Sequence, residues 1–182
     1  MQRISIAAAA ATAFVGAALA PPALAAPAHT LNDAQIANIA YTADSLDIAQ
    51  AKQALQKSHE TAVRSFAEEM VRDHTAVNRQ ALALVKQLHV TPQDNPTSQA
   101  LTAASDKERQ TLAGLSGHAY DVAYAKNEVA YHKTVNAALA STLIPDARNP
   151  KLKALLETGL KLFRMHEQHA EQLVASLTRS AR

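Results

Sequence analysis

The sequence contains no cysteine and no tryptophan, and it has only 4 glycines and 4% aromatic residues. Without cysteine, disulfide bonds, thiolate nucleophiles, iron–sulfur clusters and zinc sites with thiolate ligands are excluded. A metal ion would therefore have to be held by histidine and carboxylate side chains. The 182 residues are 48% hydrophobic and 19% charged, which supplies enough apolar material for the core of one domain.

An excess of charge of one sign is also missing. The chain has 18 Lys and Arg against 16 Asp and Glu, for a net charge of +2, and the two signs are mixed along the sequence. Nucleic-acid-binding proteins concentrate basic residues on one face or stripe. Nucleic acid is therefore not expected as a partner.

The first 25 residues have the pattern of a secretory signal peptide. Arg3 precedes a long apolar run, and the small residues Ala23 and Ala25 precede the expected cleavage site. We expect cleavage after Ala25, export to the periplasm or cell envelope, and a short tail over residues 26–31. The alternative is an uncleaved membrane anchor, because the run approaches the length that spans a bilayer. Its alanine-rich composition and the proline pair that follows favour cleavage.

The rest of the chain has the composition of helices. Alanine, leucine, glutamine, glutamate and lysine dominate, and runs of β-branched residues are missing, so the summed helix propensity is high. Serine, proline and glycine breaks divide it into four long helices and one short helix. The expected ranges are 32–56, 58–89, 98–113, 116–142 and 150–178.

Each long segment carries an apolar stripe at helical spacing, as Leu152, Leu156, Phe163 and Ala170 show for the last one. Helices with one such stripe bury it against one another in a four-helix bundle. The first two and the last two long segments are closely joined, whereas the short helix lies in a long connection between the second and the third. We therefore predict an all-α bundle over residues 32–178, with a long crossover that contains the short helix and a C-terminal tail over 179–182.

Ionisable side chains interrupt the apolar stripes. Burying such groups costs free energy unless they are paired. At a rise of about 1.5 Å per residue, the ionisable residues on the stripes of the four long segments lie within roughly two helical turns of one another along the bundle. We therefore expect a single buried polar layer. Its expected members are Asp47, His74, Glu128, His132 and His166, with Asp73, Asp121 and Tyr124 close by.

Three motifs in this polar set resemble those of a known family. They are the run from Met70 to His74, the segment from Gly117 to Asp121 with Tyr124 and His132 after it, and His166 ahead of Ala170 and Leu173. Together they resemble a secreted bacterial family of unknown function, which is assigned to the ferritin-like superfamily and is often labelled an outer-membrane protein. The resemblance implies a ferritin-like four-helix bundle in the cell envelope and no established activity.

The resemblance also implies which polar positions recur. They are Asp73, His74, Asp121, Tyr124, His132 and His166, and Asp47 stands where a glutamate is usual. The sequence departs from the family pattern at Lys161, where a proline is typical, and at Glu128, where the residue is often uncharged.

The polar layer has two interpretations. Di-iron proteins built on this bundle use a Glu-x-x-His motif on two helices, and the sequence has no such motif. A single transition-metal ion, such as zinc, iron, copper or manganese, would suit His74, His132 and His166 with Asp47 or Glu128. The alternative is a structural layer of hydrogen-bonded pairs that fix the register of the helices. The sequence alone favours this second interpretation, because a fold does not by itself confer function.

Two functions follow from these interpretations. One is a non-enzymatic binding or envelope-stress module of the cell envelope, with an envelope protein or the outer membrane as its partner. The other is a transition-metal-binding or redox protein. No serine or threonine pairs recognisably with a base, so no catalytic residue is assigned and an enzyme is not expected. Metal binding requires the three imidazoles to come within about 4 Å of a common point.

Overall fold

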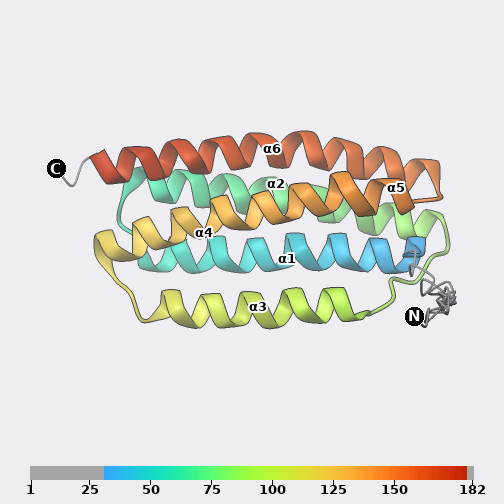
Figure 1. Cartoon of the computed structure of the whole chain (residues 1–182), viewed down its shortest axis with the longest axis horizontal. Helices are drawn as coiled ribbons and strands as arrows, with labels where there is room; N and C mark the ends of the chain where they lie inside the picture. Colours follow the sequence, from blue (N-terminus) through green and yellow to red (C-terminus); the bar gives the residue numbers. More distant parts are fainter. Residues whose placement is uncertain (1–30, 180–182) are drawn as a thin grey trace, which may run out of the picture.

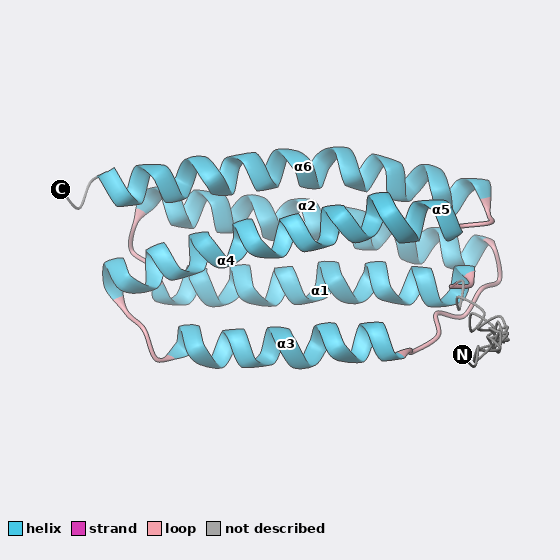
Figure 2. Cartoon of the chain, viewed as in Figure 1, coloured by secondary structure: helices cyan, strands magenta, loops and turns pink. Residues whose placement is uncertain are grey.

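The protein is helical throughout the part that the structure describes. A computed structural model describes residues 31–179, and no strand occurs among them. The long helices are α1 (Asp33–Lys57), α2 (Thr61–Gln87), α4 (Gly117–Ala138) and α6 (Pro150–Arg179). They lie side by side, and α3 (Pro96–Ala113) runs along α1 (Figures 1 and 2). The predicted all-α class is confirmed.

Helix α1 begins where its sequence provides a capping box. The Asn32 side chain accepts a hydrogen bond from the Gln35 backbone N–H at 2.9 Å, and the Gln35 side chain accepts one from the Asn32 N–H at 3.1 Å. Asp33 then accepts hydrogen bonds from the backbone N–H groups of Arg148 and Asn149, at 2.8 Å and 3.0 Å. The start of α1 is thereby tied to the loop that precedes α6.

The turn between α1 and α2 differs from the expected one. The sequence predicts Ser58 as the first residue of the second long helix, but Ser58 ends α1, and its backbone N–H bonds to the Ala54 carbonyl at 2.8 Å. The N-cap of α2 is Glu60, which lies two residues later and accepts a bond from the Ala62 N–H. Ser58 is thus the C-cap of α1 and not the N-cap of α2. Its Oγ accepts a hydrogen bond from the Glu60 backbone N–H within the turn.

The long connection between α2 and α4 crosses the length of the molecule, as predicted. Helix α3 starts after Asn95, whose side chain accepts bonds from two backbone N–H groups of the first turn, and Pro96 occupies the first helical position. It is fastened to α1 by polar contacts, including Gln50 to Ser105 at 3.2 Å and Gln53 to the Arg109 carbonyl at 3.0 Å. As a result α4 runs in the same direction as α2 (Figure 1).

The end of α4 is irregular, whereas the sequence predicts one regular helix over 116–142. A π-helical turn, η1 (Leu139–Leu143), follows α4, and the one-turn helix α5 (Ile144–Asp146) follows η1. The Ile144 N–H bonds to the Leu139 carbonyl, five residues back. The nearest sequence cause is Pro145, which has no N–H to donate and whose ring conflicts with the carbonyl four residues earlier.

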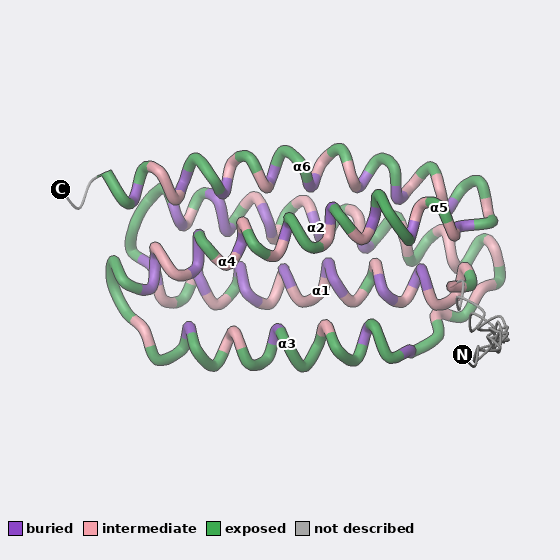
Figure 3. The backbone as a smooth tube through the Cα atoms, viewed as in Figure 1, coloured by how far each residue is buried: buried purple, intermediate pink, exposed green. Residues whose placement is uncertain are grey.

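Two apolar clusters fill the space between the helices. The first surrounds Phe66, Tyr120, Tyr124 and Leu173, towards the α1–α2 turn. The second, towards the start of α1, consists of Ile36, Ile39, Leu139, Leu143, Ala147, Leu152, Leu156 and Phe163. Buried residues recur along the sides of the long helices that face one another, but α2 has none after Asn78 (Figure 3). Six buried acids and histidines of the long helices fall between the two clusters in sequence order: Asp44, Asp47, His74, Glu128, His132 and His166. Asp121 instead lies within the first cluster, between Tyr120 and Tyr124.

None of the helices between Leu31 and Arg179 combines the length and the hydropathy needed to cross a membrane.

The first cluster makes a testable prediction. Phe66 is 0% exposed and its ring contacts Tyr124 and His169 edge to face. We expect Phe66→Ala to lower the free energy of unfolding by about 3–5 kcal/mol, because it removes a buried aromatic ring and leaves a cavity. Urea unfolding followed by circular dichroism measures this loss. The control is Leu82→Ala on the same helix, where the side chain is 48% exposed and the change should stay within about 0.5 kcal/mol. Equal losses in the two variants would contradict this description of the core.

Candidate metal centre

Three histidines from three helices converge between the apolar clusters. His74 comes from α2, His132 from α4 and His166 from α6, and all three are buried. Their centroids lie 5.2 to 5.7 Å apart. One nitrogen of each ring lies within 4.8 Å of the corresponding nitrogen of the other two. The structure thus brings together the three imidazoles that the sequence suggests as ligands.

Each imidazole is held through one of its nitrogens. His74 Nδ1 lies 2.8 Å from Asp44 Oδ1, and His166 Nε2 lies 3.1 Å from Asp73 Oδ2. His132 Nδ1 lies 3.0 Å from the backbone carbonyl oxygen four residues earlier on α4. A carbonyl oxygen can only accept, so His132 Nδ1 carries the hydrogen and Nε2 presents its lone pair in the neutral ring.

The second nitrogen of each imidazole has no hydrogen-bond partner. These atoms are His74 Nε2, His132 Nε2 and His166 Nδ1, and all three are buried without a partner in the part of the chain that the structure describes. Buried polar atoms of native proteins are nearly always hydrogen-bonded, so each of these unpaired nitrogens needs a physical explanation. A metal-binding histidine typically has this arrangement, in which one nitrogen is fixed by a carboxylate or carbonyl and the other faces the ion.

A carboxylate from α1 lies beside two of the three imidazoles. Asp47 is 1% exposed, and its Oδ2 lies 3.4 Å from His74 Nε2 and 3.6 Å from His132 Nε2. Neither Asp47 oxygen makes a hydrogen bond with the described residues. Glu128 contributes a second carboxylate, and its donor atom lies within 4.8 Å of those of Asp47 and His132.

Burial dominates the electrostatics of the carboxylates. It raises the pKa of Asp47 to about 6, although the charge of His74 acts in the opposite direction. Burial, followed by the charge of Asp47, raises the pKa of Glu128 well above its usual value, and the nearby Tyr124 hydroxyl lowers it only in part. These two carboxyl groups therefore hold protons much more readily than solvated ones.

The imidazoles respond to burial in different ways. Burial and the charges of His74 and His166 lower the pKa of His132 to about 3, so this ring is neutral at physiological pH. Burial and the charge of His74 also lower the pKa of His166. Burial lowers the pKa of His74 as well, but Asp47 and Asp44 outweigh it and the net shift is upward. A neutral imidazole is the form that binds a metal ion.

The donor set has the dimensions of a transition-metal site. Imidazole nitrogen and carboxylate oxygen bind zinc at about 2.0–2.2 Å. Since the three nitrogens lie within 4.8 Å of one another, closing onto one ion requires each ring to move by less than about 1 Å. Such a shift is within the freedom of side-chain rotation in a packed core.

The other residues predicted for the polar layer lie around this cluster. Asp73 orients His166 and also pairs with the exposed Arg72 at 2.8 Å. Tyr124 is fully buried, and burial and the charge of Glu128 raise its pKa well above the usual value. Asp121 is 6% exposed and its Oδ1 lacks a partner among the described residues, but it belongs to none of the groups with metal-binding geometry.

Two features of the site escape the sequence analysis. Asp44 lies one turn before Asp47 on the same face of α1, and that spacing is the signal that could have found it. Phe163 stacks on the His74 ring, with the ring centroids 4.7 Å apart and an angle of 17° between the ring planes. Its sequence position indicates only a core residue. Glu128 and His132, four residues apart on α4, are 0% and 1% exposed, so both lie in the buried layer.

The comparison with known families agrees with the motifs around these residues. Residues 18–173 match a family described as a domain of unknown function (DUF4142). The chain belongs to this family. No curated protein and no solved structure matches it. The DUF4142 match thus supports the resemblance to a family of unknown function, and it assigns no activity.

Glu128 gives a pH-dependent prediction. Its pKa is raised in the folded state, so the folded protein binds more protons there than the unfolded chain, and the stability that Glu128 supports falls as the pH rises above its unfolded pKa. Glu128→Gln removes this dependence. In metal-free protein the variant should gain stability over the wild type between pH 5 and pH 8, by at most about 1.4 kcal/mol per pH unit.

Urea unfolding in the presence of a chelator at several pH values measures this difference. The control is Glu171→Gln on α6, whose side chain is 48% exposed and pairs with Lys133, and which should show almost no pH-dependent change. A difference between Glu128→Gln and the wild type that is constant with pH would contradict the raised pKa.

Proposed function

We propose that this DUF4142 protein binds one transition-metal ion in the cell envelope through His74, His132 and His166, with Asp47 as a further ligand. One observation carries the proposal: each of three buried imidazoles keeps one nitrogen without a hydrogen-bond partner among residues 31–179, and the three rings offer nitrogens within 4.8 Å of one another. Of the two functions that the sequence leaves open, this geometry favours metal binding over a purely structural layer.

The structural alternative predicts a different pattern of hydrogen bonds. Pairs that only fix helix register would satisfy the inner atoms, since an unsatisfied buried polar group costs about 1–3 kcal/mol. Here one nitrogen of each ring is satisfied, through Asp44, Asp73 or a carbonyl, and the other nitrogen has no partner within the described part of the chain. A cation at the centre would satisfy the inner nitrogens and Asp47 together.

The donor chemistry limits the choice of ion. Three imidazoles with one or two carboxylates suit zinc, copper, iron or manganese, whereas calcium and magnesium prefer sites made only of oxygen. Glu128 lies close enough to act as a second carboxylate ligand or to hold a proton beside the ion. An ion bound here would supply Lewis-acid or redox chemistry, and we assign the protein no reaction.

The fold and the location belong to the same proposal. We infer that α1, α2, α4 and α6 form a ferritin-like four-helix bundle, with α3 in the crossover, because the tight α1–α2 and α4–α6 connections and the long passage between them follow that plan. Residues 1–25 lie outside the described part, and their sequence pattern supports export with cleavage after Ala25. Association with an envelope protein or the outer membrane remains a hypothesis.

Metal content tests the proposed function directly. Untagged protein should contain close to one equivalent of zinc, copper, iron or manganese by plasma mass spectrometry, and the combined variant His74→Ala/His132→Ala/His166→Ala should contain almost none. Adding the metal to chelated wild-type protein should raise its Tm, since an ion at one hundred times its Kd stabilises the fold by about 2.7 kcal/mol.

The matched control replaces a histidine on the same helix as His166. His169→Ala removes a ring whose side chain is 45% exposed and that pairs with Glu69, so metal content should stay near one equivalent. Metal-free protein that neither takes up added metal nor gains Tm would overturn the proposal and leave the polar layer a structural feature.

Export has a separate test. When the gene is expressed in a bacterium with an active secretion pathway, intact-mass analysis of the periplasmic fraction should give a chain that starts at Ala26. An Ala23→Arg/Ala25→Arg variant should keep the leader, because signal peptidase requires small residues at these positions. A cytoplasmic wild-type chain of full length would count against export.

A further inference from the structure

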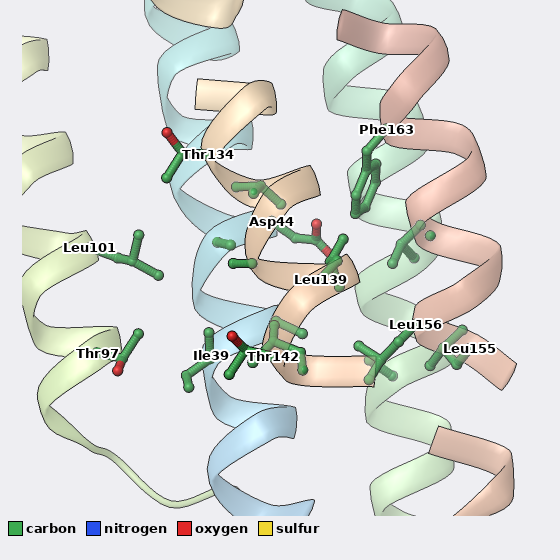
Figure 4. Close-up of a pocket in the computed structure, with 18 of the residues that line it drawn as sticks. Ile39, Asp44, Thr97, Leu101, Thr134, Leu139, Thr142, Leu155, Leu156 and Phe163 are labelled. Carbon is green, nitrogen blue, oxygen red and sulfur yellow. The ribbon is translucent and has the colours of Figure 1, made fainter. Parts of the chain in front are cut away.

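An apolar cavity of about 350 Å³ lies in the half of the molecule that contains the start of α1. Residues of α1, α2, α3, α6 and the end of α4 line it (Figure 4). Protein interiors have few voids larger than a water molecule. An engineered cavity of about 150 Å³ with apolar walls already binds benzene. A space of this size in so small a protein therefore indicates a binding site for an organic molecule.

The walls of the cavity are almost entirely apolar. The buried residues of the wall include Ile39, Ala43, Leu139 and Leu156. Asp44 is the only ionisable residue among those that line the cavity. The lining contains no lysine, arginine or histidine. A bound carboxylate or phosphate would thus lose its hydration without gaining a cationic partner, which is costly.

The cavity has an open end and a closed end. Three exposed threonines, Thr97, Thr134 and Thr142, lie at its edge on α3, α4 and η1. The opposite part of the wall contains Phe163, which is 5% exposed and whose ring stacks on His74. In Figure 4 the labelled residues extend from Thr97 and Leu101 on α3 to Leu155 and Leu156 on α6. The wall therefore extends from α3 to α6.

The π-helical turn contributes to the wall of the cavity. Leu139, Thr142 and Leu143 of η1 all line it. Single π-turns inserted at the end of an α-helix are frequent at functional sites, because they rotate side chains away from their regular helical positions. Here the turn places two leucines and a threonine along the same cavity.

We propose that this cavity binds one uncharged aliphatic molecule of about ten carbon atoms with a single polar end group, such as a medium-chain alcohol. A volume of about 350 Å³ is more than twice that of the engineered apolar cavity of about 150 Å³ that binds the six carbons of benzene. The chain lies along the leucine, isoleucine and alanine walls towards Phe163, and the hydroxyl end lies beside the threonines, which can hydrogen-bond it but offer no positive charge.

This inference goes beyond metal binding and does not depend on it. Asp44 both lines the cavity and orients His74, so a bound chain would end beside the histidine cluster. The test is made on chelated protein, so that the presence or absence of an ion does not affect its outcome.

Titration calorimetry and thermal melting with 1-decanol test the proposal. We expect saturable binding of one 1-decanol per chain and a rise in Tm. Decanoate at pH 8 should bind at least about tenfold more weakly, because its carboxylate finds no cation in the cavity. Absence of saturable 1-decanol binding, or equally tight binding of decanoate, would overturn the proposal.

A pair of variants on adjacent residues locates the binding. Ala138→Phe places a ring in the cavity from its α4 wall and should weaken 1-decanol binding at least about tenfold, whereas Ala137→Phe, on an exposed position outside the lining, should leave it unchanged. Ala81→Phe fills the cavity from α2 and replaces Ala138→Phe if that variant loses its helical circular dichroism. Equal binding to the filled and control variants would show partition onto the surface and contradict the proposal.

Discussion

Burying ionisable groups between two apolar clusters is the constraint on which the rest of this structure depends. Four helices each place an acid or an imidazole in the same layer, where every unpaired atom is costly. The outer atoms of the layer are satisfied by Asp44, Asp73 and a carbonyl group, and burial keeps His132 neutral and Glu128 inclined to hold a proton. In the neutral rings, the nitrogens left without partners among the described residues, His74 Nε2, His132 Nε2 and His166 Nδ1, are therefore available to a cation.

Helical periodicity accounts for what could be predicted from the sequence. Residues three or four positions apart share one face of a helix, which identifies the inward face. The constant rise per residue gives the depth of each residue along the helix. The layer that contains Asp47, His74 and His132 therefore follows from the sequence. Periodicity does not determine which nitrogen of a ring points inward, or that Asp44 would orient His74, because these depend on side-chain rotation. The irregular turn at Leu139 depends on the balance between Pro145 and tertiary packing, which no local pattern contains.

The cavity could not be predicted for a related reason. Its walls are ordinary core residues such as Ile39, Leu139 and Leu156, and nothing in their order along the chain distinguishes a filled core from an open one. Whether a void remains depends on the summed volumes of side chains from five helices and on the position of the π-turn. His74 connects this half of the molecule to the polar layer, since it stacks on Phe163 and bonds to Asp44.

The crossover helix has a consequence for how the protein assembles. Helices α1 and α2 form one antiparallel hairpin, and α4 and α6 form another, and each can fold from contacts that are close in sequence. The histidine layer takes His74 from the first hairpin and His132 and His166 from the second. It exists only once the hairpins have docked, after closure of the long α3 loop, whose entropic cost delays that step. An ion held there would therefore join the two hairpins, and its binding free energy would add to the free energy of their docking.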